Sequence, residues 1–197
     1  MNKNTLAALK VELKGYHTAL PVFEMKEQQL KEVMQTIETA VSRLRETIDK
    51  TDQDTRTWAA VMAEKTLDLS QLVTVDELKT QTLEIAGVIV EQFENIRFTE
   101  EEIDYFTTPL WVDAAMVAIK DQKTNLEMLK LELKNLESVR EELAEARRMK
   151  NALKEVFIPE TKNNIRKIEI YLGDVERLAI GCAKLVKKKK QVKSGSL

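Results

Sequence analysis

Residues 6–23 read LAALKVELKGYHTALPVF, and this stretch decides the fold because its apolar residues recur in alternating steps of three and four. The same spacing continues to Ile48, with Glu27 in place of one apolar residue. The stripe comprises Leu6, Leu9, Leu13, Tyr16, Leu20, Phe23, Leu30, Met34, Ile37, Val41, Leu44 and Ile48. A seven-residue repeat held this long keeps one narrow face of a helix against a partner helix, as in a coiled coil. We therefore expect one long helix over residues 4–66.

A second apolar stripe occupies the C-terminal half of the chain. It comprises Val112, Ala115, Ile119, Leu126, Leu129, Leu133, Leu136 and Leu143, and after a phase slip it resumes as Ile165, Ile168, Leu172, Val175, Ala179, Cys182 and Val186. A slip of this kind, here between Arg147 and Pro159, changes the local winding of a coiled coil. We expect a second long helix over residues 111–190, with Cys182 buried on its stripe, and a flexible tail over residues 191–197.

The segment between the two helices, residues 67–110, has a different pattern. Val73 and Val75 alternate with polar neighbours, and the β-branched run Val88–Val90 follows turn residues at 84–87. This pattern predicts a small β-hairpin, and Thr99–Glu102 fits a capping box for a short helix to about residue 105. The predicted fold class is mainly α: a long antiparallel two-helix coiled coil with a small β-hairpin insert and a short helix at one end.

Composition supports long charged helices over a compact enzyme. The 197 residues include five glycines and three prolines, and 32% of them are charged. Helix interiors tolerate glycine and proline least. Pro21 lies inside the first stripe, so we expect a kink there without an end to the helix.

Net charge and cysteine content indicate which cellular compartment and which classes of partner the sequence favours. The net charge of −2 gives no reason to expect nucleic-acid binding by the chain as a whole. One cysteine excludes an internal disulfide and favours a reducing compartment. With neither a signal-peptide core nor an apolar run long enough to span a bilayer, we expect a soluble, cytoplasmic protein.

We expect no catalytic, cofactor-binding or metal-binding residue. His17 is the only histidine, so no zinc ligand set is available, and a position on the surface of a helix explains it. The acidic cluster at residues 100–104 lacks the spacing of a calcium loop, and the dipole at the start of a helix accounts for it. No glycine-rich phosphate-binding motif occurs.

The one concentrated charge is a run of lysines near the C-terminus, comprising Lys184, Lys187, Lys188, Lys189, Lys190 and Lys193. The simplest interpretation is a solvated helix end, because lysines there favour the helix dipole. The alternatives are contact with an anionic membrane surface, with nucleic acid, or with an acidic collar on a partner protein. Nucleic acid is the least favoured of these, because no aromatic residues are interleaved with the lysines.

Two stretches resemble a known family. Residues 151–177 read NALKEVFIPETKNNIRKIEIYLGDVER, and residues 107–113 read TTPLWVD, downstream of IAGV at 85–88 and FE at 93–94. Together they resemble the bacterial branch of the D subunit of the V-type (archaeal-type) ATPases, the central rotor shaft. The resemblance covers essentially the whole chain in the order helix, hairpin, helix. The N-terminal segment lacks the NPTR start and the RGHKLLKDK run that are usual in archaeal and eukaryotic members.

The resemblance implies a non-catalytic rotor component that transmits rotation between a catalytic head and a membrane ring. Both chain ends would enter the head formed by the catalytic A and B subunits, while the hairpin end would face the membrane and contact the small F subunit of the stalk and a ring-adaptor subunit. The protein would be peripheral to the membrane, without insertion and without nucleic acid. The expected partner-binding residues at the hairpin are Val73, Val75, Val88, Val90, Phe93, Ile96 and Phe98; the expected head-contacting residues are Leu6, Leu9, Leu13, Arg177, Lys184, Lys187, Lys188, Lys189 and Lys190.

Two other functions remain open from the residues alone. One is a coiled-coil adaptor or a stalk protein of an export apparatus, although a simple export rod would lack the hairpin insert and the downstream TPLW run. The other is an enzyme, which would need a pocket with converging polar groups. Whether the transported ion is H⁺ or Na⁺ depends on the membrane ring and not on this chain.

Overall fold

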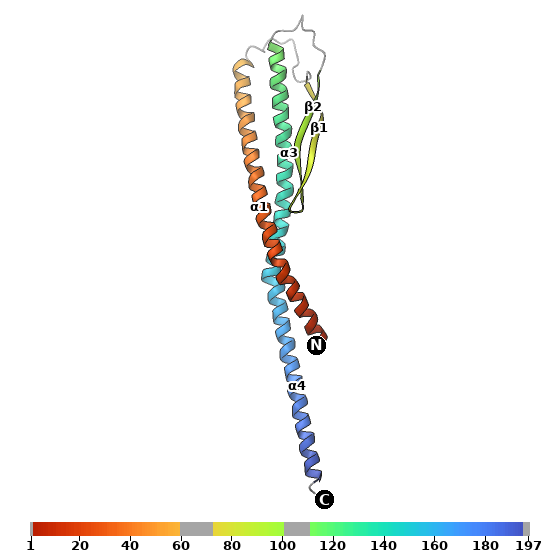
Figure 1. Ribbon diagram of the computed structural model, residues 1–197. Helices are drawn as coiled ribbons and strands as arrows, with labels where there is room; N and C mark the ends of the chain where they lie inside the picture. The colour runs from red at the N-terminus through yellow and green to blue at the C-terminus, as the bar shows by residue number, and fades with distance from the viewer. Residues whose placement is uncertain (1, 60–72, 101–110, 195–197) are drawn as a thin grey trace. The chain divides into compact units, whose positions relative to one another are not determined.

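A computed structural model describes residues 2–59, 73–100 and 111–194 of the chain. Its elements are helix α1 (Lys3–Ala59), strands β1 (Val73–Ile85) and β2 (Val88–Glu100), helix α3 (Trp111–Asn151), the π-helical turn η2 (Ala152–Phe157) and helix α4 (Ile158–Ser194) (Figure 1). The predicted order of helix, hairpin and helix is confirmed. The predicted end of the first helix at residues 60–66, and residues 101–105 of the predicted short helix, lie outside the described residues.

The chain forms two compact units. Unit 1 contains residues 1–25 and 146–197, and unit 2 contains residues 26–145. Helix α1 continues through Pro21 without ending, as predicted. Its N-terminal part belongs to unit 1 and the remainder belongs to unit 2.

In unit 2, α1 and α3 pack antiparallel to each other. The ion pairs show this direction: Lys26 contacts Glu142, and Glu38 accepts a hydrogen bond of 2.9 Å from Arg140 Nη2. The apolar stripe of α1 is buried here, with Leu30, Ile37 and Val41 among the core residues. At about 25 cal/mol per Å² of apolar surface removed from water, these aliphatic side chains supply most of the packing energy.

The hairpin is longer than the sequence predicts, because each strand has 13 residues. β1 and β2 pair antiparallel, with irregularities between Val75 and Glu77 and between Lys79 and Thr80. The turn lies inside the predicted range: Ala86 has φ of 53° and Gly87 has φ of 80°. Two positive φ values are the pattern of a type I′ turn, whose twist matches that of the flanking strands. The hairpin runs alongside α3 (Figure 1).

The predicted stripe on α3 is only partly correct. Leu136 and Leu143 are buried as expected, but Leu126 and Leu133 are exposed, and Leu131, Asn135 and Val139 are buried in addition. The reason is that α3 contacts both α1 and the hairpin, so its buried face is wider than the narrow stripe of a two-helix coiled coil.

In unit 1, the start of α1 packs antiparallel to α4. Lys3 Nζ lies 3.4 Å from Glu176 Oε1, and Lys10 Nζ lies 2.6 Å from Glu169 Oε1. The buried residues on α4 are Ile158, Thr161, Ile165 and Ile168. Burial of Ile165 and Ile168 confirms the first part of the stripe predicted after the phase slip.

The phase slip has a structural cause, the π-helical turn η2. The Ile158 N–H donates to the carbonyl of Leu153, five residues back, and both side chains are buried. One extra residue in this turn carries the stripe from Leu153 to Ile158 in a step of five. Pro159 follows directly, and because it has no N–H and its ring crowds the carbonyl four residues earlier, a widened turn before it relieves this conflict.

The prediction that Cys182 is buried is wrong. Cys182 is exposed, as are Val175 and Val186 on the same stripe. Helix α1 begins at Lys3, opposite Glu176. Residues of α4 beyond Glu176 therefore extend past the first residue of α1, so α1 does not cover their apolar side chains.

Candidate partner-binding surfaces

One face of the hairpin packs on the protein's own helices. Val73, Val88 and Val90, which the sequence suggests as partner contacts, are buried there. Their side chains have no surface left for a partner in this conformation. Burial of β-branched residues on one face of a two-stranded sheet gives the hairpin the support that it lacks alone.

The base of the hairpin is held by an apolar cluster. Val73 packs with Val112 and Met116 of α3, and Phe98, Trp111 and Ile119 lie against them. Lys123 of α3 also donates a hydrogen bond to the carbonyl of Val73. The ends of the two strands that are far from the turn are thus attached to the first turns of α3.

Asn135 of α3 holds the hairpin nearer its turn. The Asn135 Nδ2 donates to the Glu91 carbonyl at 2.7 Å, and the Glu91 N–H donates to Asn135 Oδ1 at 3.0 Å. The side chain is 3% exposed. This amide satisfies one backbone donor and one backbone acceptor that β1 does not use. Next to it, Lys134 Nζ lies 2.9 Å from the Glu91 carboxylate.

The remaining predicted hairpin contacts keep surface for a partner. Phe93, Ile96 and Phe98 are half-buried, whereas Val75 is exposed. Two residues that the sequence analysis did not include are also available. Ile85 and Ile89 flank the turn and are exposed, Ile89 to 65%.

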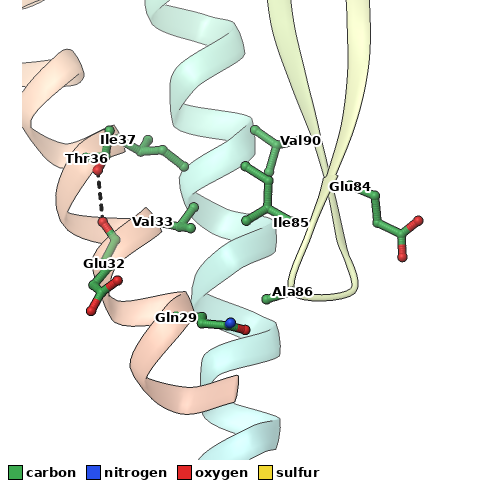
Figure 2. A pocket seen from close by; sticks show the side chains of 9 residues that line it. All are labelled: Gln29, Glu32, Val33, Thr36, Ile37, Glu84, Ile85, Ala86 and Val90. Carbon is green, nitrogen blue, oxygen red and sulfur yellow. Dashed lines mark hydrogen bonds between the residues drawn. The ribbon is translucent and has the colours of Figure 1, made fainter. Parts of the chain in front are cut away.

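A groove of about 540 Å³ lies between α1 and the turn of the hairpin. Figure 2 shows Val33 and Ile37 of α1 facing Ile85 and Val90 of the hairpin. The other lining residues are Gln29, Glu32, Thr36, Glu84 and Ala86. The polar groups of this lining are the carboxylates of Glu32 and Glu84, the Gln29 amide and the Thr36 hydroxyl, which donates to the Glu32 carbonyl.

The predicted head contacts at the N-terminus lie within unit 1. Leu6, Leu9 and Leu13 are half-buried, on the face of α1 that carries the ion pairs with α4. Each therefore contributes to the helix pair and retains some exposed surface. A separate shallow apolar groove lies on α1, lined by Val11, Lys14, Gly15, Thr18, Ala19, Val22 and Phe23.

The predicted contacts at the C-terminus are fully available. Lys184 and Lys187–Lys190 are exposed, and Arg177 pairs with Asp174 at 3.3 Å. Leu178, Leu185 and Val186 are exposed among them, Leu178 to 69%. From residue 177 to residue 194 the sequence contains no aspartate or glutamate. This part of α4 is a basic helix with an exposed apolar stripe.

Two ionisable groups have shifted pKa values. In unit 1 the Tyr16 hydroxyl donates a 2.5 Å hydrogen bond to Glu12, and this bond, with partial desolvation and the nearby carboxylates, raises the tyrosine pKa. Tyr16 also stacks on Phe157 of η2 with ring centroids 5.6 Å apart. In unit 2 burial raises the pKa of Glu132, and a hydrogen bond from Asn135 opposes part of that effect.

Among the described residues, no group of three or more histidines, cysteines, aspartates or glutamates is arranged to hold a metal ion. His17 is exposed on α1, which agrees with the surface position expected from the sequence. No helix in the described ranges is long and apolar enough to cross a membrane. The acidic cluster at residues 100–104 has no described side chain.

Sequence reasoning missed Asn135 as a residue that positions the hairpin. Its signal was present, because Asn135 is a polar residue one position before Leu136 on the apolar face of α3. From the sequence alone, however, such a residue is predicted to lie in solvent at the edge of the apolar stripe, because the position of the hairpin is unknown. The backbone groups of Glu91 that make burial of this amide favourable are contributed by another element.

The fold defines a class: a long-helix protein with a β-hairpin packed on α3. A family model described as the ATP synthase D subunit matches residues 5–188. The V-type ATP synthase D subunit of Borreliella burgdorferi is 29% identical over 187 residues, which cover 95% of this chain and 92% of that protein. The V-type ATP synthase D subunit of Chlamydia trachomatis is 26% identical over 197 residues, covering 97% and 95%. The chain belongs to the family of ATP synthase D subunits.

Proposed function

We propose that this chain is the central-stalk shaft of a V-type ATPase or ATP synthase and transmits rotation between the catalytic head and the membrane ring. The family names a component of such a complex. The observation that supports the proposal is the antiparallel pairing of α1 with α3 in unit 2, where its apolar stripe is buried, and with α4 in unit 1, where its stripe is half-buried. A shaft must resist bending and twisting, and continuous side-chain packing between helices provides that stiffness.

The shaft itself carries out no catalysis in this proposal. Hydrolysis or synthesis of ATP takes place in the A and B subunits, and this chain acts through contacts with them. It stays peripheral to the membrane on the cytoplasmic side. Its hairpin end binds the small F subunit of the stalk and the ring adaptor, through the accessible residues Val75, Phe93, Ile96 and Phe98.

The two chain ends contact the catalytic head. The head-contacting residues are Leu6, Leu9, Leu13, Arg177, Lys184, Lys187, Lys188, Lys189 and Lys190. The exposed lysines of α4 favour an acidic surface on the head, and the exposed apolar stripe beside them favours apolar contacts there.

Affinity purification of the tagged chain from its own cells tests the assignment. We expect two large nucleotide-binding subunits and a small partner to be recovered, with ATPase activity in the eluate. Recovery of export-apparatus components in their place would make the chain an export stalk, and recovery of the chain alone would refute membership of the rotary complex.

The role of the basic end has its own test. Replacing Lys187–Lys190 with glutamine should lower the ion transport obtained per ATP hydrolysed. A matched variant replaces four exposed lysines elsewhere, Lys50, Lys79, Lys162 and Lys167, and should leave coupling unchanged. Equal coupling in both variants would refute the contact between the basic end and the head.

A further inference from the structure

We propose that Asn135 is the positioning residue that fixes where the hairpin sits along α3. The proposal rests on the stalk function for the importance of the hairpin, but the contact itself can be tested on the chain alone. Its basis is the pair of hydrogen bonds, at 2.7 and 3.0 Å, between one buried side-chain amide and the backbone N–H and carbonyl of Glu91 on β2.

The hairpin has two attachments to α3. One is the apolar cluster at its base, against which Phe98 of β2 and Ile119 of α3 both pack. The other is the contact between Asn135 and Glu91. Seven residues of β2 separate Glu91 from Phe98, which is roughly 23 Å of strand. The 16 residues from Ile119 to Asn135 rise about 24 Å along α3. The two lengths agree, so β2 follows α3 in the opposite direction between the two attachments.

The two attachments differ in what they specify. Apolar contacts are non-directional, but a shift by two residues would move Val88 or Val90 off its buried site and bring the polar Gln92 toward it. The Asn135 amide pairs with an outward-facing N–H and carbonyl of β2, and such positions recur only at every second residue of a strand edge. A shift by one residue would therefore leave the buried amide and the backbone groups of β2 without partners. Asn135 and the apolar packing together select one register.

This register determines which hairpin residues a partner meets. Ile89 lies two residues before Glu91 on β2, and Ile85 lies at the end of β1, where it pairs with Val88 across the turn. Both isoleucines are exposed, and the Asn135 contact holds this end of the hairpin on α3. Without the contact, the end near the turn is free to pivot on the base cluster. The partner surface would then move independently of the shaft.

Amide hydrogen exchange measured by NMR on the full chain tests the contact. Asn135→Leu keeps the branching of the side chain but removes both the acceptor of the Glu91 N–H and the donor to the Glu91 carbonyl. We expect at least about tenfold faster exchange at the Glu91 amide, which corresponds to the loss of a typical buried hydrogen bond. At Phe98, beside the base cluster, the exchange rate should change by less than about twofold, because the apolar attachment remains.

Lys134→Ala is the matched control, because it removes the neighbouring ion pair to the Glu91 carboxylate and leaves both backbone hydrogen bonds. We expect its Glu91 amide to exchange at nearly the wild-type rate. Unchanged exchange at Glu91 in Asn135→Leu would overturn the proposal, and so would equal acceleration throughout α1, α3 and the hairpin, since that result indicates general destabilisation.

A second measurement separates this contact from the stalk function. In the assembled ATPase, Asn135→Leu should lower ion transport per ATP hydrolysed while hydrolysis continues. If the Glu91 amide is released but coupling is unchanged, the hairpin does not transmit rotation, and its part in the proposed function fails while the contact stands. If exchange is unchanged, Asn135 does not fix the register, whatever the coupling.

Discussion

The two units bury the same apolar stripe of α1 to different depths. In unit 2, Leu30 is 0% exposed, and Ile37 and Val41 are also buried. In unit 1, none of the corresponding stripe residues from Leu6 to Phe23 is fully buried. The difference comes from the number of elements, because α3 and the hairpin form a broader core with α1 than α4 can form alone. A two-helix segment leaves part of its apolar stripe accessible to solvent.

The largest expected effect comes from comparing a one-residue deletion in the regular part of α4 with one in the π-helical turn η2. Deleting Lys162 from α4 shifts Ile165 and Ile168 by one residue relative to Ile158, so both leave the buried face. We expect a loss of about 4 kcal/mol, from two aliphatic side chains at roughly 1.5–3 kcal/mol each. Thermal unfolding followed by circular dichroism measures the change.

Deleting Val156 from η2 is the matched experiment. Val156 is exposed, and its removal shortens the step from Leu153 to Ile158 from five residues to four, which suits a regular α-helix. In a Pro159→Ala background, which removes the conflict that the widened turn relieves, we expect a change of less than about 1 kcal/mol, the range usual for a surface change with little packing consequence. Equal destabilisation by the two deletions would contradict the view that η2 absorbs one extra residue.

Leucine truncation compares the units directly. Leu30→Ala in unit 2 should cost about 3 kcal/mol, because it removes a fully buried side chain and leaves a cavity. Leu13→Ala in unit 1 should cost only about 1 kcal/mol, because that residue is already half-exposed and water can fill the space. Urea denaturation of both variants gives the free energies of unfolding. Similar values would mean that unit 1 is as completely packed as unit 2.

The turn of the hairpin allows a smaller comparison between adjacent residues. Both Ala86 and Gly87 have positive φ. Gly87→Ala should cost about 1 kcal/mol, since an added Cβ disfavours that conformation. Ala86→Gly should cost nothing or stabilise the hairpin slightly, because it removes the same disfavoured Cβ. Exchange rates of the amides on either side of the turn report both effects, and stabilisation by Gly87→Ala would contradict the assigned turn.

The smallest effect concerns pH. Burial raises the pKa of Glu132 above its ordinary value of 4.5, so the folded state binds this proton more tightly than the unfolded state. Stability from this group is therefore full at pH below 4.5 and is lost as pH rises through the folded pKa. Glu132→Gln should stabilise the chain at about pH 7 by roughly a few tenths of a kcal/mol after solvent screening, and should change little at about pH 4. Melting temperatures of both proteins at the two pH values measure this difference. Stabilisation by Glu132→Gln at the acidic pH alone would mean that the pKa of Glu132 is lowered in the folded state.

The apolar spacing of three and four residues was enough to predict the helices and the phase slip before Pro159. Their antiparallel pairing was predicted from their similar lengths and the single insert that joins them. The alternation around Val73 and Val88 was enough to predict the hairpin and its turn. Cys182 was misplaced because periodicity shows which face of a helix is apolar, but not where the covering helix begins. Leu131, Asn135 and Val139 were missed for a related reason, since a stripe does not show how many neighbours a helix has.

The sequence by itself determined which segments are helix and strand, because backbone preference and apolar period are local properties of the chain. The tertiary structure alone decided which apolar residues are buried and which stay exposed, and it gave Asn135 its two backbone partners. The physical reason is that burial depends on the neighbour that excludes water, and a buried amide is favourable only where another element supplies its donor and acceptor.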